Sequence, residues 1–251
     1  MARAAVLGRL TWQVGTVTEV RDETPTARTL VLDVPDWTGH QAGQHVDVRL
    51  TAPDGYSAQR SYSIASPPGG TKLELTVQRL EDGEVSPYLA ETLAPGDPLE
   101  LRGPIGGWFV WTPADPGPVL LVAGGSGIVP LMAMIRARAG SGNRAPFRLV
   151  YSVRSADAAL YAAELADRAR TDAGLELSYV YTRSAPPGWP GPAGRINAGI
   201  LTAGRPAPPG TAVFICGPTG FVEAAANLLI DAGQDAQTIK TERFGPSGGQ
   251  P

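Results

Sequence analysis

The chain contains one cysteine and two histidines, and this shortage excludes several kinds of site. The single thiol, Cys216, cannot form a disulfide within the chain. It also cannot ligate an iron–sulfur cluster or a cysteine-based zinc ion, because each needs several thiolates. The two imidazoles, His40 and His45, are poor material for any other metal centre. The sequence therefore predicts no metal site.

No run of about 18 apolar residues occurs, so no membrane-spanning helix is expected. The apolar stretch at the N-terminus is too short for a secretory signal, which favours a cytoplasmic location. The formal net charge of −3 and the pI near 5.5 argue against a nucleic-acid partner. With 251 residues, 43% of them hydrophobic, the chain has material for one large domain or two ordinary ones.

The first half of the chain has the pattern of β-structure. Short runs rich in Val, Thr and Leu alternate with turns that contain Pro and Gly. Strands are expected at 14–20, 29–34, 43–50, 60–66, 73–79 and 99–101. Several short strands at this spacing predict an antiparallel β-barrel.

The second half alternates short apolar strands with helices. Residues 112–118 hold three prolines and a glycine, as a linker does, so a first domain is expected over 1–113 and a second over 114–251. Strands are expected at 119–123, 147–152, 175–181, 211–216 and 238–244, with helices at 129–139, 156–173, 196–201 and 221–232. This alternation predicts a parallel α/β sheet, which binds ligands at the carboxyl ends of its strands. The last residues, 245–251, are expected to form a mobile tail.

Three motifs carry candidate chemistry. The first is Arg60-Ser61-Tyr62-Ser63, where Arg60 and Tyr62 share one face of an expected strand. A guanidinium fork matches phosphate and a tyrosine offers a flat apolar ring, so the pair suits a planar, phosphate-bearing cofactor. An ordinary half-exposed strand is the alternative for this stretch alone.

The second motif is Gly83-x-x-Ser86. Ser86 precedes Pro87, which predicts a serine N-cap followed by proline in the first helical position. The start of such a helix presents free N–H groups to an anion. A plain capped helix with no ligand fits the same residues.

The third motif is the loop 124–130, with sequence Gly-Gly-Ser-Gly-Ile-Val-Pro, between an expected strand and an expected helix. Glycines there let a backbone approach a pyrophosphate without a side-chain clash. Cys216-Gly217-Pro218 ends another strand at the same edge of the sheet. A sharp turn, and a cysteine acting as a small buried hydrophobe, are the simpler interpretations.

Taken in this order, the motifs resemble the ferredoxin–NADP reductase family of FAD-dependent flavoenzymes, from about Trp12 to Phe244. The resemblance implies FAD on the barrel and NADPH, with NADH as the alternative, on the second domain. It also implies electron transfer to a separate ferredoxin or other redox protein. A reductase of free flavin or small molecules, and a non-catalytic electron-transfer subunit, remain alternatives.

The resemblance assigns roles residue by residue. Residues implied at the hydride-transfer site are Ser63, Tyr62, Cys216 and Glu242. Residues implied around FAD are Arg60, Tyr62, Ser63, His45, Val77, Arg79, Gly83, Val85 and Ser86, with Phe244 stacked on the ring unless it is a core aromatic. Residues implied around the nucleotide are Gly124, Gly125, Ser126, Gly127, Cys216, Gly217 and Pro218.

The stretch after the second strand of the second domain bears on nucleotide choice. Ser152 and Arg154 offer a hydroxyl and a cation for the extra phosphate of NADPH, and Tyr161 is expected to stack on the adenine. The alternative is that Arg154 is simply a solvated residue opening a helix.

Overall fold

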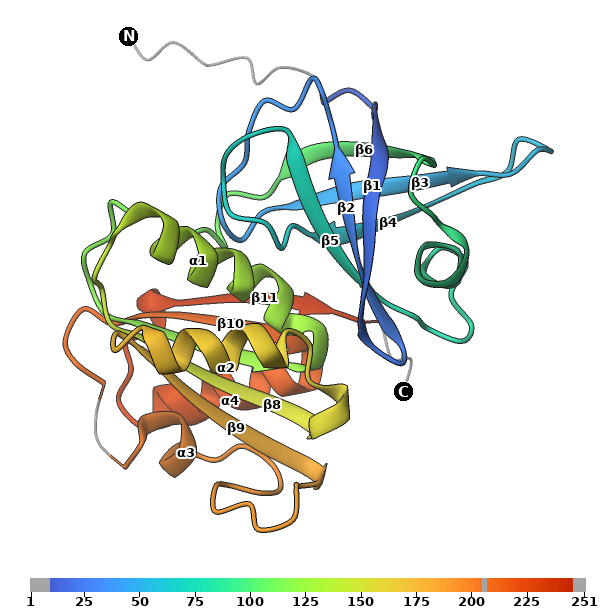
Figure 1. The fold of residues 1–251 in the computed structure, drawn as a ribbon. Helices are drawn as coiled ribbons and strands as arrows, with labels where there is room; N and C mark the ends of the chain where they lie inside the picture. Colours follow the sequence, from blue (N-terminus) through green and yellow to red (C-terminus); the bar gives the residue numbers. More distant parts are fainter. Residues whose placement is uncertain (1–9, 205–206, 246–251) are drawn as a thin grey trace, which may run out of the picture.

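The computed structural model describes residues 10–204 and 207–245, which form two bodies side by side (Figure 1). The first body is an antiparallel sheet in the strand order β4-β3-β6-β1-β2-β5. Its strands are β1 (Gln13–Thr24), β2 (Ala27–Asp33), β3 (His45–Thr51), β4 (Ser57–Ser63), β5 (Lys72–Gln78) and β6 (Pro98–Ile105). The two outer strands approach each other at an isolated bridge between Ile64 and Leu75, which closes the sheet toward a barrel.

The core of this barrel follows from alternation along the strands. In β3, Val46 and Val48 are fully buried, and the alternating residues Asp47 and Arg49 point outward. Both bond to charged partners on β6. In β3 one face therefore fills the interior and the other carries ion pairs.

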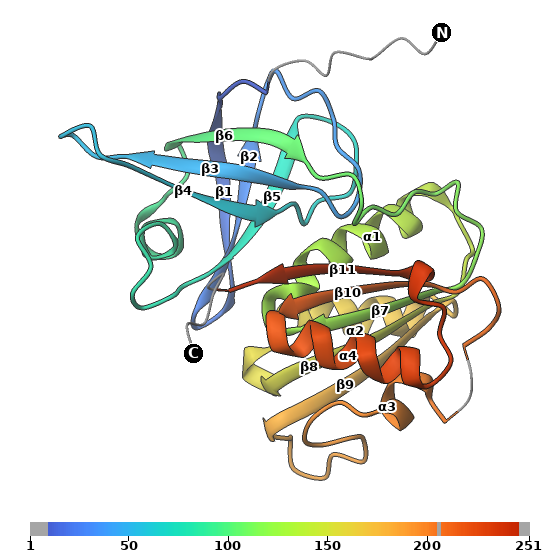
Figure 2. The ribbon, with the colours of Figure 1, turned by 180° about the vertical axis from the view of Figure 1, so that it is seen from behind.

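The second body is a parallel sheet in the order β11-β10-β7-β8-β9. Its strands are β7 (Val119–Gly124), β8 (Phe147–Ser155), β9 (Leu175–Ser184), β10 (Ala212–Pro218) and β11 (Ile239–Phe244). Helices α1 (Ile128–Ser141) and α2 (Ala162–Thr171) cover one face, and α3 (Ala198–Thr202) and α4 (Thr219–Asp231) cover the other, as Figure 2 shows from behind. Short 3-10 turns lie at Gly125–Gly127, Ala156–Ala158 and Ala236–Thr238.

Neighbouring residues of β7 divide the two hydrophobic layers. Leu121 packs into the layer under α1 and α2, and Val122 packs into the layer over α4. Both residues are fully buried because helices cover both faces, which explains why these strands are apolar runs without alternation. The expected fold class, an antiparallel barrel followed by a parallel α/β sheet, is confirmed.

The chain crosses between the two bodies in the segment that follows β6. Trp111 pairs with Ala42 of the first body and meets the ring of Phe147 of the second edge-on, with centroids 5.0 Å apart. The division at 113/114 remains a prediction, and this aromatic contact shows that the segment just before it already packs on the second core.

Two helical predictions are wrong in detail. Ser86 does not cap a helix: its hydroxyl accepts from the Leu80 N–H at 3.1 Å, and only a five-residue π-helix, Tyr88–Thr92, follows Pro87. The helix expected at 156–173 is broken, because Tyr161 takes a left-handed backbone (φ 57°) and α2 begins after it. The serine instead closes its own loop. At the break, the backbone N–H of Tyr161 bonds to Glu23 of the barrel.

Within the described ranges no helix is long and apolar enough to span a membrane. The same ranges contain no group of three or more side chains arranged to hold a metal ion. The mobile tail was expected at 245–251; of these residues only Gly245 is described, and 246–251 lie outside the described part of the chain, as do 1–9 and 205–206.

Candidate active site at the domain junction

Four candidate site residues lie next to one another across the junction between the two bodies. Ser63, the last residue of β4, is the cross-strand partner of His45. The Nδ1 atom of His45 lies 3.9 Å from Oε1 of Glu242, which belongs to the parallel sheet. Glu242 is in turn the register partner of Cys216 on β10. The structure thus brings together residues that are as far as 197 positions apart in the printed sequence, from His45 to Glu242 (242 − 45).

Glu242 sits in an unusual electrostatic position. Its side chain is 24% exposed, and Oε2 has no hydrogen-bond partner among the described residues. Burial raises the pKa of this carboxyl to about 7, and burial lowers the pKa of the nearby His45. Near neutral pH the histidine therefore favours its uncharged form, and the carboxyl keeps a proton to a much higher pH than an ordinary glutamate does. A buried carboxyl oxygen without a partner is a fitting neighbour for a bound cofactor with polar atoms.

This pKa shift predicts a stability effect with a definite sign. The folded pKa of Glu242 lies above its ordinary value of 4.5, so its stabilising contribution is complete below pH 4.5 and is lost as the pH rises through about 7. Glu242→Gln mimics the protonated form, and we expect it to be more stable than the native protein at pH 8 by roughly 1 to 2 kcal/mol, after allowance for partial exposure. At pH 4.5 the two proteins should differ little.

Urea unfolding at pH 4.5 and pH 8 checks this result. Glu223→Gln, which neutralises an exposed carboxylate on α4, is the matched control. An equal pH trend in the native protein and in Glu242→Gln would show that Glu242 is not the titrating group.

The two glycine-containing loops touch each other through their backbones. A Cβ atom on Gly127 would lie only 2.1 Å from the carbonyl oxygen of Cys216, so no side chain fits at this position. Gly124 and Gly217 both face the ring of Phe221, at 2.7 and 2.8 Å from a built Cβ. The loops after β7 and β10 are therefore packed directly against each other through their backbones, with the Phe221 ring beside Gly124 and Gly217.

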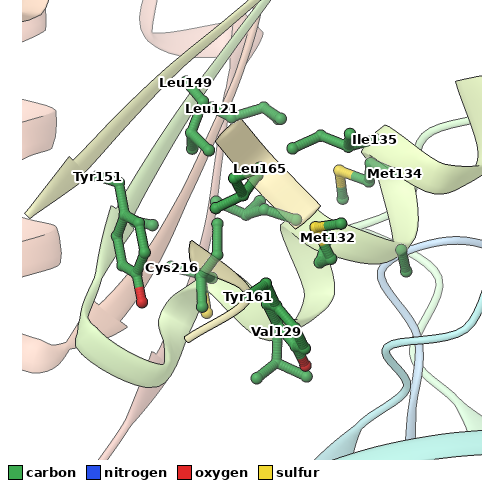
Figure 3. Packing of buried hydrophobic residues seen from close by; sticks show 14 of the residues in the cluster. Leu121, Val129, Met132, Met134, Ile135, Leu149, Tyr151, Tyr161, Leu165 and Cys216 are labelled. Carbon is green, nitrogen blue, oxygen red and sulfur yellow. The ribbon is translucent and has the colours of Figure 1, made fainter. Parts of the chain in front are cut away.

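Cys216 lies at the contact between the two loops. It is 2% exposed, and Figure 3 shows it beside the start of α1 with Val129 and Tyr161. Burial raises the pKa of its thiol well above the ordinary value, so the sulfur stays protonated. A neutral buried thiol is suited to packing beside a ligand and not to nucleophilic attack.

On the barrel side, Arg60 is held by a partner that the sequence did not reveal. Its Nη2 donates to Oε2 of Glu84 at 2.7 Å, and the hydroxyl of Tyr56 donates to Oε1 of the same carboxylate at 2.7 Å. All three side chains are exposed. A phosphate at this fork would take the place of the Glu84 carboxylate, which presents the same planar pair of oxygens.

The other residues expected around FAD divide by burial. Tyr62 is half-buried, and burial raises the pKa of its hydroxyl to about 12, so the ring stays neutral. Val77 and Val85 are fully buried in the barrel core, which leaves only their backbone for contact with a cofactor. Arg79 forms an ion pair with Glu91 at 2.9 Å.

The Gly83–Ser86 loop is tight, because a Cβ atom on Gly83 would lie 2.6 Å from the Ser86 hydroxyl. It follows β5 closely in the chain, since Leu80, whose N–H bonds Ser86, lies two residues after Gln78 at the end of that strand. The motif is thus a compact turn that leads into a short helix, and the Ser86 hydroxyl does not cap the start of that helix.

Ser152 and Arg154 lie near the carboxyl end of β8, the strand next to the edge strand β9. Ser152 is 6% exposed, whereas Arg154 is exposed and has no ion-pair or hydrogen-bond partner among the described residues. Arg183 lies at the end of the neighbouring strand β9, where Ser155 and Ser184 are register partners and an irregularity leaves Arg154 opposite Thr182 and Arg183. Arg183 was not among the residues expected from the sequence, although two arginines ending neighbouring parallel strands were a detectable signal.

Two expectations for aromatic residues meet different surroundings. Tyr161 is 4% exposed and its hydroxyl bonds that of Thr76 in the barrel, so its ring offers no free face to an adenine. That expectation is corrected: Tyr161 belongs to the domain junction. Phe244 is 38% exposed at the end of β11, beside Pro218 of β10, and is therefore not a core aromatic. Its stacking on the flavin remains a prediction.

Comparison with known proteins agrees with this geometry. Residues 14–110 match the oxidoreductase FAD-binding domain, and residues 121–227 match the oxidoreductase NAD-binding domain. The chain is 33% identical to ferredoxin–NADP reductase B of Sorangium cellulosum, over 90% of this chain and 94% of that protein. It is 30% identical to the phenol hydroxylase P5 protein of Acinetobacter pittii, over 91% of this chain but 64% of that protein.

Solved structures show the same arrangement. The FAD/NAD-binding domain of nitric oxide dioxygenase from Vibrio cholerae superposes with a TM-score of 0.81 at 25% identity, covering 93% of this chain and 99% of that one. A ferredoxin–NADP reductase from Neisseria gonorrhoeae, solved with bound FAD and NADP, shares the fold with a TM-score of 0.77 at 22% identity, over 92% of this chain and 98% of that one.

The fold and the junction site thus define a two-domain flavoenzyme, with the flavin on the barrel and a dinucleotide on the parallel sheet. The chain belongs to the ferredoxin–NADP reductase-like family of FAD-dependent NAD(P)H oxidoreductases. It binds FAD and a nicotinamide nucleotide, and it passes electrons from NAD(P)H through FAD to a separate acceptor.

Proposed function

We propose that this enzyme takes its hydride from NADPH in preference to NADH and delivers the electrons to a ferredoxin or a similar one-electron redox protein. The observation that carries the nucleotide choice is the pair Arg154 and Arg183, both exposed near the carboxyl ends of the neighbouring strands β8 and β9, with Ser152 two residues before Arg154. The phosphate that distinguishes NADPH is anionic with several acceptor oxygens. Two exposed guanidinium groups without a partner among the described residues are suited to bind it.

The junction residues have separate tasks in this proposal. FAD supplies the central chemistry, because a flavin takes up two electrons as a hydride and releases them one at a time. Arg60 pairs with cofactor phosphate in place of Glu84, Tyr62 packs on the flavin, and the Ser63 hydroxyl donates near the reacting nitrogen. Exposed Phe244 covers the ring from the sheet side.

The nucleotide side is shaped mainly by backbone. The loops carrying Gly127 and Cys216 support the nicotinamide end, where the absence of side chains permits close approach. Glu242, with a pKa near 7, holds a proton at the point where the two domains meet. A carboxyl with this pKa gains and loses a proton readily at neutral pH.

The choice of acceptor rests on composition and on relatives. The single cysteine of the given sequence cannot ligate an iron–sulfur cluster, so an iron–sulfur acceptor lies outside these residues. The Sorangium protein is named for ferredoxin and NADP, and a relative from Ralstonia, 27% identical, is named as the ferredoxin–NAD(P)+ reductase component of oxygenase systems. These names support a ferredoxin as the partner. The same proposal places the reaction in the cytoplasm.

Steady-state kinetics with both nucleotides test the proposal. We expect the native enzyme to favour NADPH at least tenfold in kcat/KM, and Arg154→Ala to lose roughly ten- to a hundredfold on NADPH, in keeping with a lost charged hydrogen bond. Activity with NADH should change less than about twofold. Arg170→Ala is the control. It removes an exposed arginine that pairs with Asp167 near the C-terminal end of α2.

The acceptor is tested in the same assay. A plant-type ferredoxin, free FMN and ferricyanide are compared as acceptors at saturating NADPH. Turnover with ferredoxin supports the proposal, whereas turnover with free FMN and none with ferredoxin identifies a small-molecule reductase. Equal use of both nucleotides, or an unchanged preference in Arg154→Ala, would show that Arg154 does not select the nucleotide.

A further inference from the structure

A closed ring of hydrogen bonds joins the two domains away from the reacting groups. The hydroxyl of Thr29 on β2 donates to Oε1 of Glu23 at 2.7 Å, because a carboxylate only accepts. Thr29 has no second proton, so Thr76 on β5 donates to it, also at 2.7 Å. By the same reasoning the Tyr161 hydroxyl donates to Thr76.

The ring closes through the backbone of Tyr161. Its N–H donates to Oε2 of Glu23 at 3.2 Å, so both ends of this one residue are fixed to the barrel. That bond accounts for the broken helix: Tyr161 adopts φ 57°, a conformation uncommon for a residue with a side chain, and directs its N–H out of the helical pattern. Thr29, Thr76 and Tyr161 are all at least 94% buried, so water does not compete for these bonds.

A second connection runs beside the ring, through Arg136 on α1. Its Nη1 donates to the carbonyl oxygen of Ala65 at 2.9 Å and to Oε2 of Glu74 at 2.8 Å, both in the barrel. Its Nε and Nη2 donate to Glu164 on α2 at 3.0 and 2.5 Å. The guanidinium carbon also lies 5.2 Å from the centre of the Tyr161 ring, within the range of a cation–π interaction.

The elements that these bonds connect are those that carry the reacting partners. Arg136 lies about two turns into α1, the helix that begins at the Gly124–Gly127 loop. Ala65 lies two residues after Ser63, at the end of the strand that carries the flavin residues. A bond from Arg136 to Ala65 therefore fixes the nucleotide loop and the flavin strand to each other through two rigid elements (Figure 1).

We propose that Tyr161 and Arg136 are positioning residues that set the approach of the nicotinamide to the flavin. Hydride transfer requires the reacting atoms to be about 3 to 3.5 Å apart, and an error of about 1 Å costs on the order of a hundredfold in rate. The two partners are bound on different domains, so their separation depends on how the domains are held. The inference rests on the enzyme class and not on which nucleotide or acceptor is used.

Tyr161→Phe is the sharpest test, because it keeps the ring and the contact with Arg136 and removes only the hydroxyl. We expect the limiting rate of flavin reduction at saturating NADPH, measured by rapid mixing, to fall at least tenfold. The NADPH concentration at half-saturation and the FAD content should stay within about twofold of native. The charge-transfer absorbance of the nucleotide complex, which reports ring stacking, should decrease.

Further variants distinguish an effect on the positioning of the two domains from an effect on stability alone. Thr76→Val breaks the same ring, so the double variant should be no slower than either single one. Tyr179→Phe makes the same chemical change on a hydroxyl that has no partner in the described part of the chain, and it should leave the rate unchanged. Arg136→Lys keeps the charge but not the fork, and we expect it to be at least as slow as Tyr161→Phe.

A native reduction rate per bound flavin in Tyr161→Phe would overturn the proposal, even if the protein melted at a lower temperature, since the ring would then serve stability alone. Equal slowing in Tyr179→Phe would overturn it as well. The ratio of NADPH to NADH activity should be unchanged in all these variants, so failure here is distinguishable from failure of the Arg154 assignment.

Discussion

Gly127→Ala should reduce nucleotide-driven reduction of the flavin at least a hundredfold while FAD remains bound. The added Cβ would lie 2.1 Å from the Cys216 carbonyl oxygen, 2.4 Å from its carbonyl carbon and 2.8 Å from the Gly217 nitrogen. All three are backbone atoms at the end of a central strand, so no flexible side chain can move aside. The loop must instead shift, which carries the start of α1 away from its place, and a displacement of about 1 Å accounts for this factor.

Gly140→Ala is the matched control for this prediction. It lies in the last turn of the same helix, with nothing within 4 Å of a built Cβ. We expect it to retain full activity and to gain up to about 1 kcal/mol of stability from better helix propensity. Rapid-mixing reduction by NADPH, with FAD content measured on the same samples, checks both variants. A Gly127→Ala protein that reduces its flavin at a native rate would show that the two loops do not form the nucleotide surface.

The second large effect is that substitutions of two β4 residues, Ser63 and Arg60, should have opposite consequences for reduction rate and for FAD binding. Ser63→Ala should lower the limiting rate of flavin reduction roughly ten- to a hundredfold and leave FAD bound, because the hydroxyl acts on the reacting centre. Arg60→Ala should do the reverse: FAD dissociates readily, but each bound flavin is reduced at a near-native rate. The reason is that a phosphate contact lies far from the chemistry and stabilises ground and transition states alike.

FAD retained after gel filtration and the reduction rate per bound flavin separate these outcomes. Ser61→Ala is the control for the serine, since its hydroxyl donates to Asp47 at 2.7 Å on the barrel surface. Parallel losses of cofactor and of rate in both variants would contradict the separate roles of Ser63 and Arg60.

Much of this molecule was predictable from local sequence. Buried parallel strands are continuous apolar runs, as at Val119–Gly124, and half-buried antiparallel strands alternate, as at His45–Thr51. A glycine loop between such a strand and a helix has few conformations available, so its position at the ligand edge of the sheet follows from topology. These features depend on neighbours within a few residues, which is why local pattern predicted the fold class, whereas the binding role of the two loops came from the family resemblance.

Local pattern misled where a distant residue decided the conformation. The segment around Tyr161 has the composition of a helix, yet Glu23, 138 positions earlier, accepts its N–H and breaks that helix. The Ser86 hydroxyl had the right spacing for a cap and instead closed its own loop on Leu80. In both cases one hydrogen bond that spacing does not reveal outweighed helix propensity, which amounts to less than about 1 kcal/mol per residue.

The electrostatics of the site were decided by tertiary structure alone. Nothing in the sequence Thr-Glu-Arg-Phe indicates that Glu242 titrates near pH 7; that value arises because folding places the carboxyl at a domain junction where little water remains. Likewise Arg60 and Glu84 become partners only when β4 and the loop after β5 converge. The sequence by itself determined the strands of both sheets, and with them the edge of the parallel sheet at which ligands are expected. The packing of one domain on the other determined the charge state, the partners and the spacing of the residues placed there, because those depend on distances between atoms far apart along the chain.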